Sequence, residues 1–189
     1  GFDIVTIPAV GVGERVNLVL EETQSKDDVE IEKKYKVEHD IVRDRLLKYK
    51  TRSSGVDFEE NTPLRVDDSR YLVRVRSVGS RYILTVKGPN IGSNVRKKAE
   101  YNTEIPEGAA SMLMKALKPY YPYKKRREIF SPVGDRKCTI CLDTVEGLGE
   151  FVEIEAATEN QVLSWERRLG IARYAVDKSY YELVAEAKR

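Results

Sequence analysis

Apolar and polar residues alternate with a period of two along most of this chain. In residues 72–78, for example, Val73 and Val75 alternate with Arg74 and Arg76. Successive side chains of a β-strand point to opposite faces, so this period predicts strands with one apolar and one charged face. The predicted strands are residues 29–37, 72–78, 82–87, 97–105, 123–130, 137–145 and 151–157, with a weaker one near 56–59. Short turns separate several of them, which favours a mainly antiparallel sheet or barrel.

Four segments have helical spacing instead, and they fall between the predicted strands. Residues 158–169 begin with the capping box Thr158-x-x-Gln161 and end at Gly170, which are usual start and stop signals of a helix. The predicted helices are residues 38–49, 108–117, 158–169 and 179–187. Residues 1–28 contain two short apolar runs and are treated as an N-terminal extension of unassigned role. Residues 29–189 are expected to form one domain.

The composition limits the class of protein. The 189 residues include 33 Lys and Arg and 31 Asp and Glu, a formal net charge of +2, which argues against a polybasic nucleic-acid-binding protein. Two cysteines provide no disulfide framework and favour a reducing, cytoplasmic location. No stretch approaches the ~20 apolar residues of a membrane span, so we expect no membrane partner. The single histidine, His39, argues against an imidazole-based zinc site and is expected at the surface, near a helix start.

The charges on the predicted strands are sorted by face. Glu30, Glu32 and Lys34 share one face of their strand, and Arg74 and Arg76 share one face of theirs. A solvated outer face of the sheet would explain any single strand. Seven such strands together favour a barrel that closes with its charged faces inward and its apolar faces outward, under the helices. Because an uncompensated buried charge costs several kcal/mol, such an interior would be wet or would hold a polyanion with its metal ions.

Clustered bases beside clustered acids suit one kind of ligand. Lys and Arg bind phosphate oxygens, and Arg does so through both arms of its guanidinium. Carboxylates bind Mg²⁺ or Mn²⁺, hard cations that also bridge to phosphates. The pattern therefore suggests a metal–polyphosphate site, in which positioning and charge neutralisation provide most of the catalysis of phosphoryl transfer.

The motif E-x-E-x-K, at residues 30–34, opens an ordered set of charged segments. These are V-R-V-R at 73–76, L-T-V-K-G-P at 84–89, A-E-Y-N-T-E-I at 99–105, K-R-R-E-I-F at 125–130, I-C-L-D-T-V-E-G-L-G-E-F-V-E-I-E at 140–155 and K-S-Y-Y-E-L-V at 178–184. Over roughly residues 29–184 the set resembles the CYTH superfamily, the triphosphate tunnel metalloenzymes, which include class IV adenylyl cyclases and thiamine triphosphatases. The resemblance implies an α+β, mainly β fold: an eight-stranded antiparallel β-barrel tunnel with flanking helices, which holds a triphosphate.

The resemblance also implies a role for the charged residues of these motifs. The metal ligands would be Glu30, Glu32, Asp143, Glu153 and Glu155. The triphosphate would be held by Lys34, Arg74, Arg76, Lys87, Lys125 and Arg127. The residues expected in catalysis are Lys34, Lys87, Arg127 and Asp143. Glu100 stands where the family often has a pair of acids and is a further candidate, although Asn102 replaces the second acid.

The resemblance implies an enzyme that acts on the triphosphate of ATP or a related compound, with Mg²⁺ or Mn²⁺ as cofactor. In a cyclase, the ribose 3′-hydroxyl of ATP attacks the α-phosphorus and pyrophosphate leaves, which gives cyclic AMP. In a triphosphatase, water attacks the terminal phosphorus of tripolyphosphate, thiamine triphosphate or a nucleotide. The segment D-x-V-E-G-L-G and the ending S-Y-Y-E-L are most similar to the class IV adenylyl cyclase branch. The cyclase is therefore the first hypothesis and the triphosphatase the alternative.

A third hypothesis is a non-catalytic module that binds polyphosphate. Such a module would need the bases of the motifs but not the full set of acids. All five of the expected metal-binding acids are present in this chain, which favours an enzyme. The expected partner is the triphosphate substrate, without nucleic acid or membrane, and a homodimer is left open.

Overall fold

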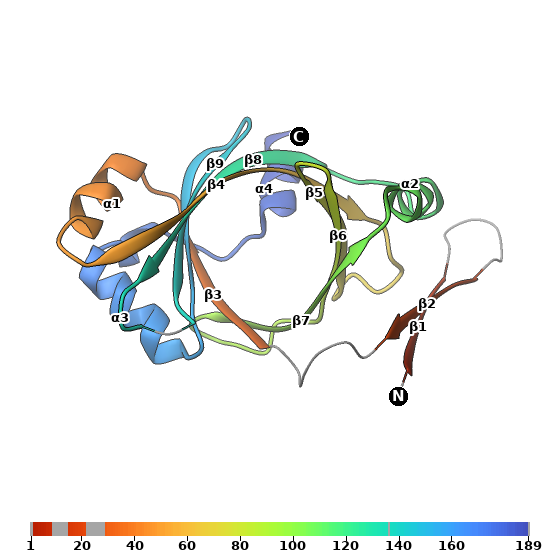
Figure 1. The fold of residues 1–189 in the computed structure, drawn as a ribbon, viewed down its shortest axis with the longest axis horizontal. Helices are drawn as coiled ribbons and strands as arrows, with labels where there is room; N and C mark the ends of the chain where they lie inside the picture. The colour runs from red at the N-terminus through yellow and green to blue at the C-terminus, as the bar shows by residue number, and fades with distance from the viewer. Residues whose placement is uncertain (1, 9–14, 22–28, 136, 189) are drawn as a thin grey trace.

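Eight antiparallel strands close into a barrel in the computed structural model, which describes residues 2–8, 15–21, 29–135 and 137–188 (Figure 1). The strands are β3 (Val29–Tyr35), β4 (Thr51–Leu64), β5 (Leu72–Val78), β6 (Arg81–Lys87), β7 (Arg96–Ile105), β8 (Tyr123–Pro132), β9 (Thr139–Val145) and β10 (Gly149–Glu155). Their order around the wall is β10-β9-β8-β4-β5-β6-β7-β3, and β10 pairs with β3 to close the ring. The predicted eight-stranded barrel is confirmed.

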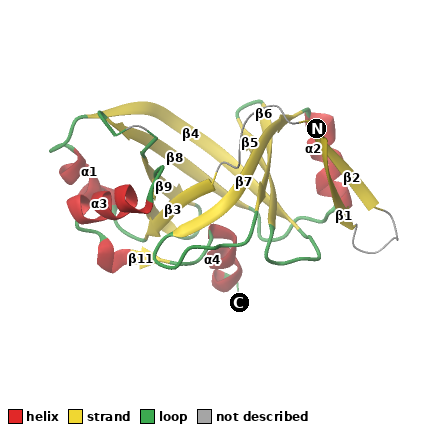
Figure 2. Ribbon diagram, turned by 90° about the horizontal axis from the view of Figure 1, so that it is seen from below, coloured by secondary structure: helices red, strands yellow, loops and turns green. Residues whose placement is uncertain are grey.

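The described part of the chain contains four α-helices, of which α1, α2 and α3 lie beside the barrel wall and α4 lies at one end of the barrel (Figures 1 and 2). They are α1 (His39–Leu46), α2 (Glu107–Ala116), α3 (Glu159–Leu169) and α4 (Tyr180–Ala187). A 3₁₀ turn, η1 (Ala172–Tyr174), precedes the short strand β11 (Ala175–Val176), which pairs with β3. The N-terminal strands β1 (Phe2–Pro8) and β2 (Arg15–Glu21) pair only with each other in the described structure, as a separate hairpin.

Strand β4 is much longer than the sequence predicts. Its 14 residues extend from Thr51 to Leu64, whereas the alternation indicates a strand only near residues 56–59. The register against β8 shifts between Ser53 and Val56, and Gly55 there has a φ of 108°. Such a bulge inserts unpaired residues and interrupts the period of two, so one long strand looks like a short one in the sequence.

The apolar faces of the strands point outward and are covered by helices, as predicted. Against β9 and β10, α3 packs in a cluster whose members include Leu142, Ile154, Val162 and Trp165. On the other side of the barrel, α2 covers β5 and β6 in a second buried cluster. The helices thus provide the hydrophobic core outside the wall, so the interior of the barrel is free to carry polar side chains.

The expectation for His39 is wrong. This residue begins α1, as predicted, but its side chain is buried because α1 packs on β10. Its Nε2 lies 3.0 Å from the carbonyl oxygen of Phe151, and its backbone N–H donates to Glu150. Cys138 and Cys141 are both buried, with free thiols. Among the described residues, none of the helices has the length and apolar character that crossing a membrane requires.

Candidate functional site

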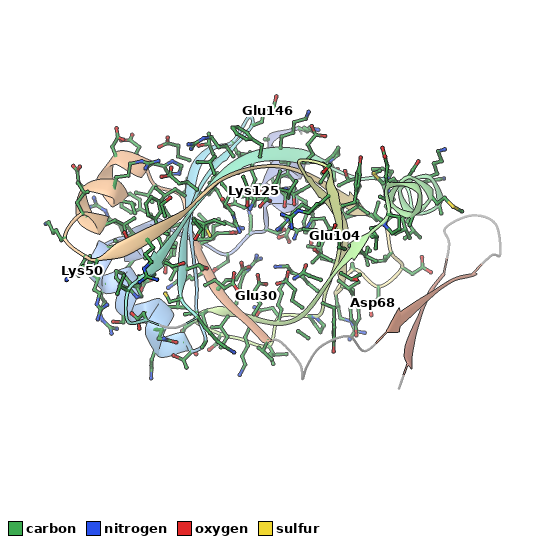
Figure 3. The ribbon with its side chains drawn as sticks, viewed as in Figure 1. Glu30, Lys50, Asp68, Glu104, Lys125 and Glu146 are labelled. Carbon is green, nitrogen blue, oxygen red and sulfur yellow. The ribbon has the colours of Figure 1, made fainter. Side chains whose placement is uncertain are left out.

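The charged faces of the strands line the interior of the barrel. Figure 3 shows Glu30 of β3 and Lys125 of β8 directed into the interior from opposite parts of the wall. Between β10 and β3 the register places Glu153 beside Lys34 and Glu155 beside Glu32. The side chain of Lys125 is only 2% exposed. Basic and acidic groups are therefore enclosed together, and the contacts between them determine what the interior can bind.

Asp143 organises the bases of β8. Its carboxylate is completely buried and accepts hydrogen bonds from Arg127 Nε at 2.7 Å and Arg127 Nη2 at 2.6 Å. It also accepts from Lys125 Nζ at 3.2 Å and from the Tyr180 hydroxyl at 2.8 Å. Arg127 Nη2 additionally pairs with Glu153. The Asp143 carboxylate thus receives four donors, and it holds two of the expected phosphate-binding side chains in place.

Glu59 is a second buried anion in the same group of bases. Its carboxylate lies 3.3 Å from Arg76 Nε, 3.5 Å from Lys125 Nζ and 4.0 Å from Arg127 Nε. Burial acts to raise the pKa of Glu59, but Lys125, Arg76 and Arg127 outweigh it and lower the pKa to about 2. Glu59 is therefore ionised at neutral pH, as the counter-ion of three cations.

In the same group of bases, Arg74 of β5 has one hydrogen-bond donor without an acceptor. Arg74 Nη1 donates to the Tyr123 hydroxyl and Nη2 to Thr85, both at 3.4 Å. Its Nε has no hydrogen-bond partner, and it is the one such buried side-chain nitrogen or oxygen among the described residues. Burial and the neighbouring Arg74 and Arg127 lower the pKa of Arg76. A buried donor without an acceptor, beside crowded cations, is the arrangement expected where an anion binds.

Acids gather instead around Lys87, on the walls formed by β3, β7 and β10. Lys87 Nζ lies 2.5 Å from Glu30 and 3.1 Å from Glu100. Burial, and then the nearby Glu32, raise the pKa of Glu30 well above its usual value, against the opposing effect of Lys87. Loss of solvent, together with Glu100 and Glu32, also raises the pKa of Glu155. Burial is the largest cause of both raised pKa values, and repulsion between neighbouring carboxylates adds to it. At Glu100, in contrast, Lys87 outweighs burial and the pKa falls to about 2.

The structure divides the expected metal ligands between these two environments. Glu30, Glu32, Glu155 and the further candidate Glu100 lie around Lys87, and we call them the acidic group. Asp143 and Glu153 belong to the basic group, where Arg127, Lys34 and Lys125 outweigh the effect of burial and lower the pKa of Glu153 well below its usual value. Among the described residues, no three acidic, His or Cys side chains are already arranged closely enough to hold a metal ion.

Several interior residues are missing from the sequence-based site. They are Glu59, Asn61, Thr85, Arg96, Lys98 and Tyr180. Arg96 and Lys98 have the same strand parity as Glu100 and are placed by the register opposite Glu32 and Glu30, so parity alone could have found them. Glu59 lies in the weakly predicted strand near 56–59, which carries none of the family motifs. Tyr180 reaches the site from a helix, for which strand parity gives no signal.

The fold and this arrangement define a class: a closed antiparallel barrel whose interior carries paired bases and acids, with most of the bases in one part and most of the carboxylates around Lys87 in another. The sequence model of the CYTH domain family matches residues 28–169 of this chain. The chain belongs to this family of triphosphate tunnel proteins, and the resemblance in the motifs is confirmed. A search of curated proteins found no match.

Solved structures with the same fold come from several organisms. PH1012 protein from Pyrococcus horikoshii OT3 is 26% identical, with a TM-score of 0.71 over 82% of this chain and 98% of that one. Conserved hypothetical protein Pfu-838710-001 from Pyrococcus furiosus is 25% identical, with a TM-score of 0.71 over 82% and 99%. HpAC1 from Hippeastrum, described as having a dominant triphosphatase activity, is 13% identical, with a TM-score of 0.63 over 84% and 95%. At that identity, HpAC1 supports the fold alone.

Proposed function

We propose that this protein is a divalent-metal-dependent enzyme that acts on the triphosphate of ATP or a related compound. The observation that carries the proposal is the separation of charge inside the barrel. Arg74, Arg76, Lys125 and Arg127 surround one part of the interior, where Arg74 Nε has no partner. The carboxylates of Glu30, Glu32, Glu100 and Glu155 line another part, around Lys87. A chain of phosphates coordinated by a divalent cation needs both surfaces, whereas a simple anion would need only the first.

The acidic group fits a divalent cation by the chemistry of its donors. Glu30, Glu32, Glu100 and Glu155 offer hard oxygen ligands. Repulsion between these carboxylates adds to burial in raising the pKa values of Glu30 and Glu155, and a cation would relieve it. We assign Mg²⁺ or Mn²⁺ to these four residues. When bound, the ion neutralises phosphate charge and polarises the phosphorus under attack. Asp143 and Glu153, in contrast, are occupied by cations, so we assign them to the orientation of Arg127, Lys125 and Lys34.

The bases have a common task in either reaction. Lys34, Arg74, Arg76, Lys125 and Arg127 would hold phosphate oxygens and stabilise the charge that develops as the bond to phosphorus breaks. Lys87 is bound between Glu30 and Glu100 and would adjust the charge of the acidic group. Because these groups are already held by buried partners, they need little rearrangement to bind phosphate, which favours catalysis by positioning.

Two reactions are consistent with this site. The cyclase-like reaction is first, because the segments around Asp143 and Tyr180 are most similar to class IV adenylyl cyclases. Hydrolysis of a triphosphate is the alternative. The cations and carboxylates of the interior would serve either reaction.

A product analysis distinguishes the hypotheses. The protein is incubated with ATP and, separately, with tripolyphosphate, in Mg²⁺ and then Mn²⁺, and the products are separated. Cyclic AMP with pyrophosphate identifies the cyclase, and orthophosphate identifies the triphosphatase. If neither substrate is converted although tripolyphosphate binds, the proposal of an enzyme is wrong and the protein is a binding module. If tripolyphosphate does not bind at all, the assignment of the interior as a triphosphate site is wrong.

A further inference from the structure

Tyr180 is the point at which the C-terminal helix contacts the charged interior. It is the first residue of α4, and Figure 2 shows α4 at one end of the barrel. Its side chain is buried and packs against Phe151 and Tyr123, with ring centroids 5.3 and 5.7 Å away. These contacts fix the position of the ring, so its effect on neighbouring charges is also fixed.

The hydroxyl of Tyr180 is bound to the carboxylate that organises the bases. It donates to Asp143 Oδ2 at 2.8 Å, the same oxygen that accepts from Lys125 Nζ at 3.2 Å and Arg127 Nη2 at 2.6 Å. A carboxylate oxygen has a limited number of lone pairs to share. The Tyr180 hydroxyl therefore takes part of the charge of Asp143 that would otherwise hold Lys125 and Arg127 more tightly.

The ring of Tyr180 contacts two of the bases directly. Lys34 Nζ lies 3.8 Å from the ring centroid and Lys125 Nζ lies 5.2 Å from it. Both ammonium groups are buried, and cation–π attraction is stronger where water is excluded. The same segment gives Lys34 a further partner, since the carbonyl oxygen of Lys178 accepts a hydrogen bond from Lys34 Nζ at 3.2 Å. A neutral ring holds a cation in place without neutralising its charge, so the cation keeps its attraction for phosphate.

We infer that Tyr180 is a positioning residue for the phosphate site, acting through Lys34, Lys125 and Asp143. The inference rests on the proposed function, because it concerns the same bases. Tyr180 need not touch the substrate. Its ring and hydroxyl hold two ammonium groups and one carboxylate from β3, β8 and β9 in the arrangement that receives phosphate oxygens. Docking of α4 thereby becomes a condition for strong binding of the triphosphate.

The test compares Tyr180→Leu, Tyr180→Phe and the control Tyr181→Leu on the neighbouring residue of the same helix, whose ring packs against Tyr120. KM and kcat are measured for inorganic tripolyphosphate in Mg²⁺, and its dissociation constant by calorimetry. Loss of the ring in Tyr180→Leu should raise KM about tenfold, because Lys34 and Lys125 are then held less firmly for phosphate, and kcat should fall as well, because the same bases stabilise the transition state. Tyr180→Phe keeps the ring and should raise KM only about threefold. Tyr181→Leu should stay within about twofold of the wild type.

A rise in KM distinguishes a positioning role of Tyr180 from a purely structural one. If Tyr180 only supports folding, its variants lose active protein, so kcat falls while KM is unchanged, and that result overturns the inference. An unchanged KM in Tyr180→Leu overturns it whatever happens to kcat. The proposed function fails separately, in the wild type. If the wild type binds tripolyphosphate without converting it, the dissociation constants replace KM in the same comparison.

Discussion

Glu59→Gln removes the buried anion that three cations share, and the structure indicates how much this costs. The pKa of Glu59 falls from 4.5 to about 2, because Lys125, Arg76 and Arg127 outweigh the effect of burial. A pKa difference of one corresponds to about 1.36 kcal/mol. The charged form of Glu59 therefore stabilises the folded protein by about 3 kcal/mol at pH 7, an order-of-magnitude value.

The sign of the pH dependence follows from the lowered pKa. Stability from Glu59 is fully present above the pKa of the unfolded chain, 4.5, and is lost as the pH falls toward about 2. Urea unfolding of the wild type and Glu59→Gln should thus differ by about 3 kcal/mol at pH 7 and by only about half as much at pH 3. The control is Glu60→Gln, on the outer face of the same strand, where an exposed pair with Lys124 is worth at most about 1 kcal/mol.

An added anion provides a second measurement on the same variant. Without Glu59, Arg76 loses its carboxylate partner, and Lys125 and Arg127 keep only Asp143 and Glu153, so tripolyphosphate should stabilise Glu59→Gln more than it stabilises the wild type. A stability difference below about 0.5 kcal/mol at pH 7, or one that is the same at pH 3, would refute the view of Glu59 as the ionised counter-ion of the basic group.

Three further outcomes are expected. The double variant Glu30→Gln/Glu32→Gln should lose turnover and keep metal-free binding of tripolyphosphate in calorimetry, and unchanged turnover would contradict the metal assignment. Arg74→Met should raise the KM for tripolyphosphate at least about tenfold, since a charged hydrogen bond contributes about 1.5–3 kcal/mol, and a KM within twofold of the wild type would contradict a phosphate role. Burial raises the pKa of Cys138 to about 12 and that of Cys141 to about 11, so both thiols should react with iodoacetamide at pH 7.5 only after unfolding. Rapid labelling of the native protein would contradict this.

The barrel could be predicted from the sequence because strand parity is a strong signal where one face is apolar. Val73 and Val75 pack outward under α2, and Arg74 and Arg76 point inward, as their alternation indicates. The bulge at Gly55 breaks this alternation, so the first residues of β4 could not be predicted. Glu59 lies inside the segment predicted at 56–59, but no motif marked it as a site residue.

Contacts between elements distant in the sequence were not predictable from local patterns. His39 is buried because α1 packs on a strand more than a hundred residues away in the sequence. Tyr180 donates a hydrogen bond to Asp143, 37 residues away in the sequence. The residues next to Tyr180 in the sequence do not indicate this contact. The motifs identified which residues carry charge, but the pairing of Asp143 with bases rather than with other acids depends on the register of β8 and β9.

The separation of charge inside the barrel is tested most directly by a crystal structure with tripolyphosphate and Mn²⁺, using the anomalous signal of manganese. We predict manganese at Glu30 and Glu32, and phosphate oxygens in contact with Arg74 and Arg127. Manganese at Asp143, or tripolyphosphate bound only on the outer surface, would contradict the account.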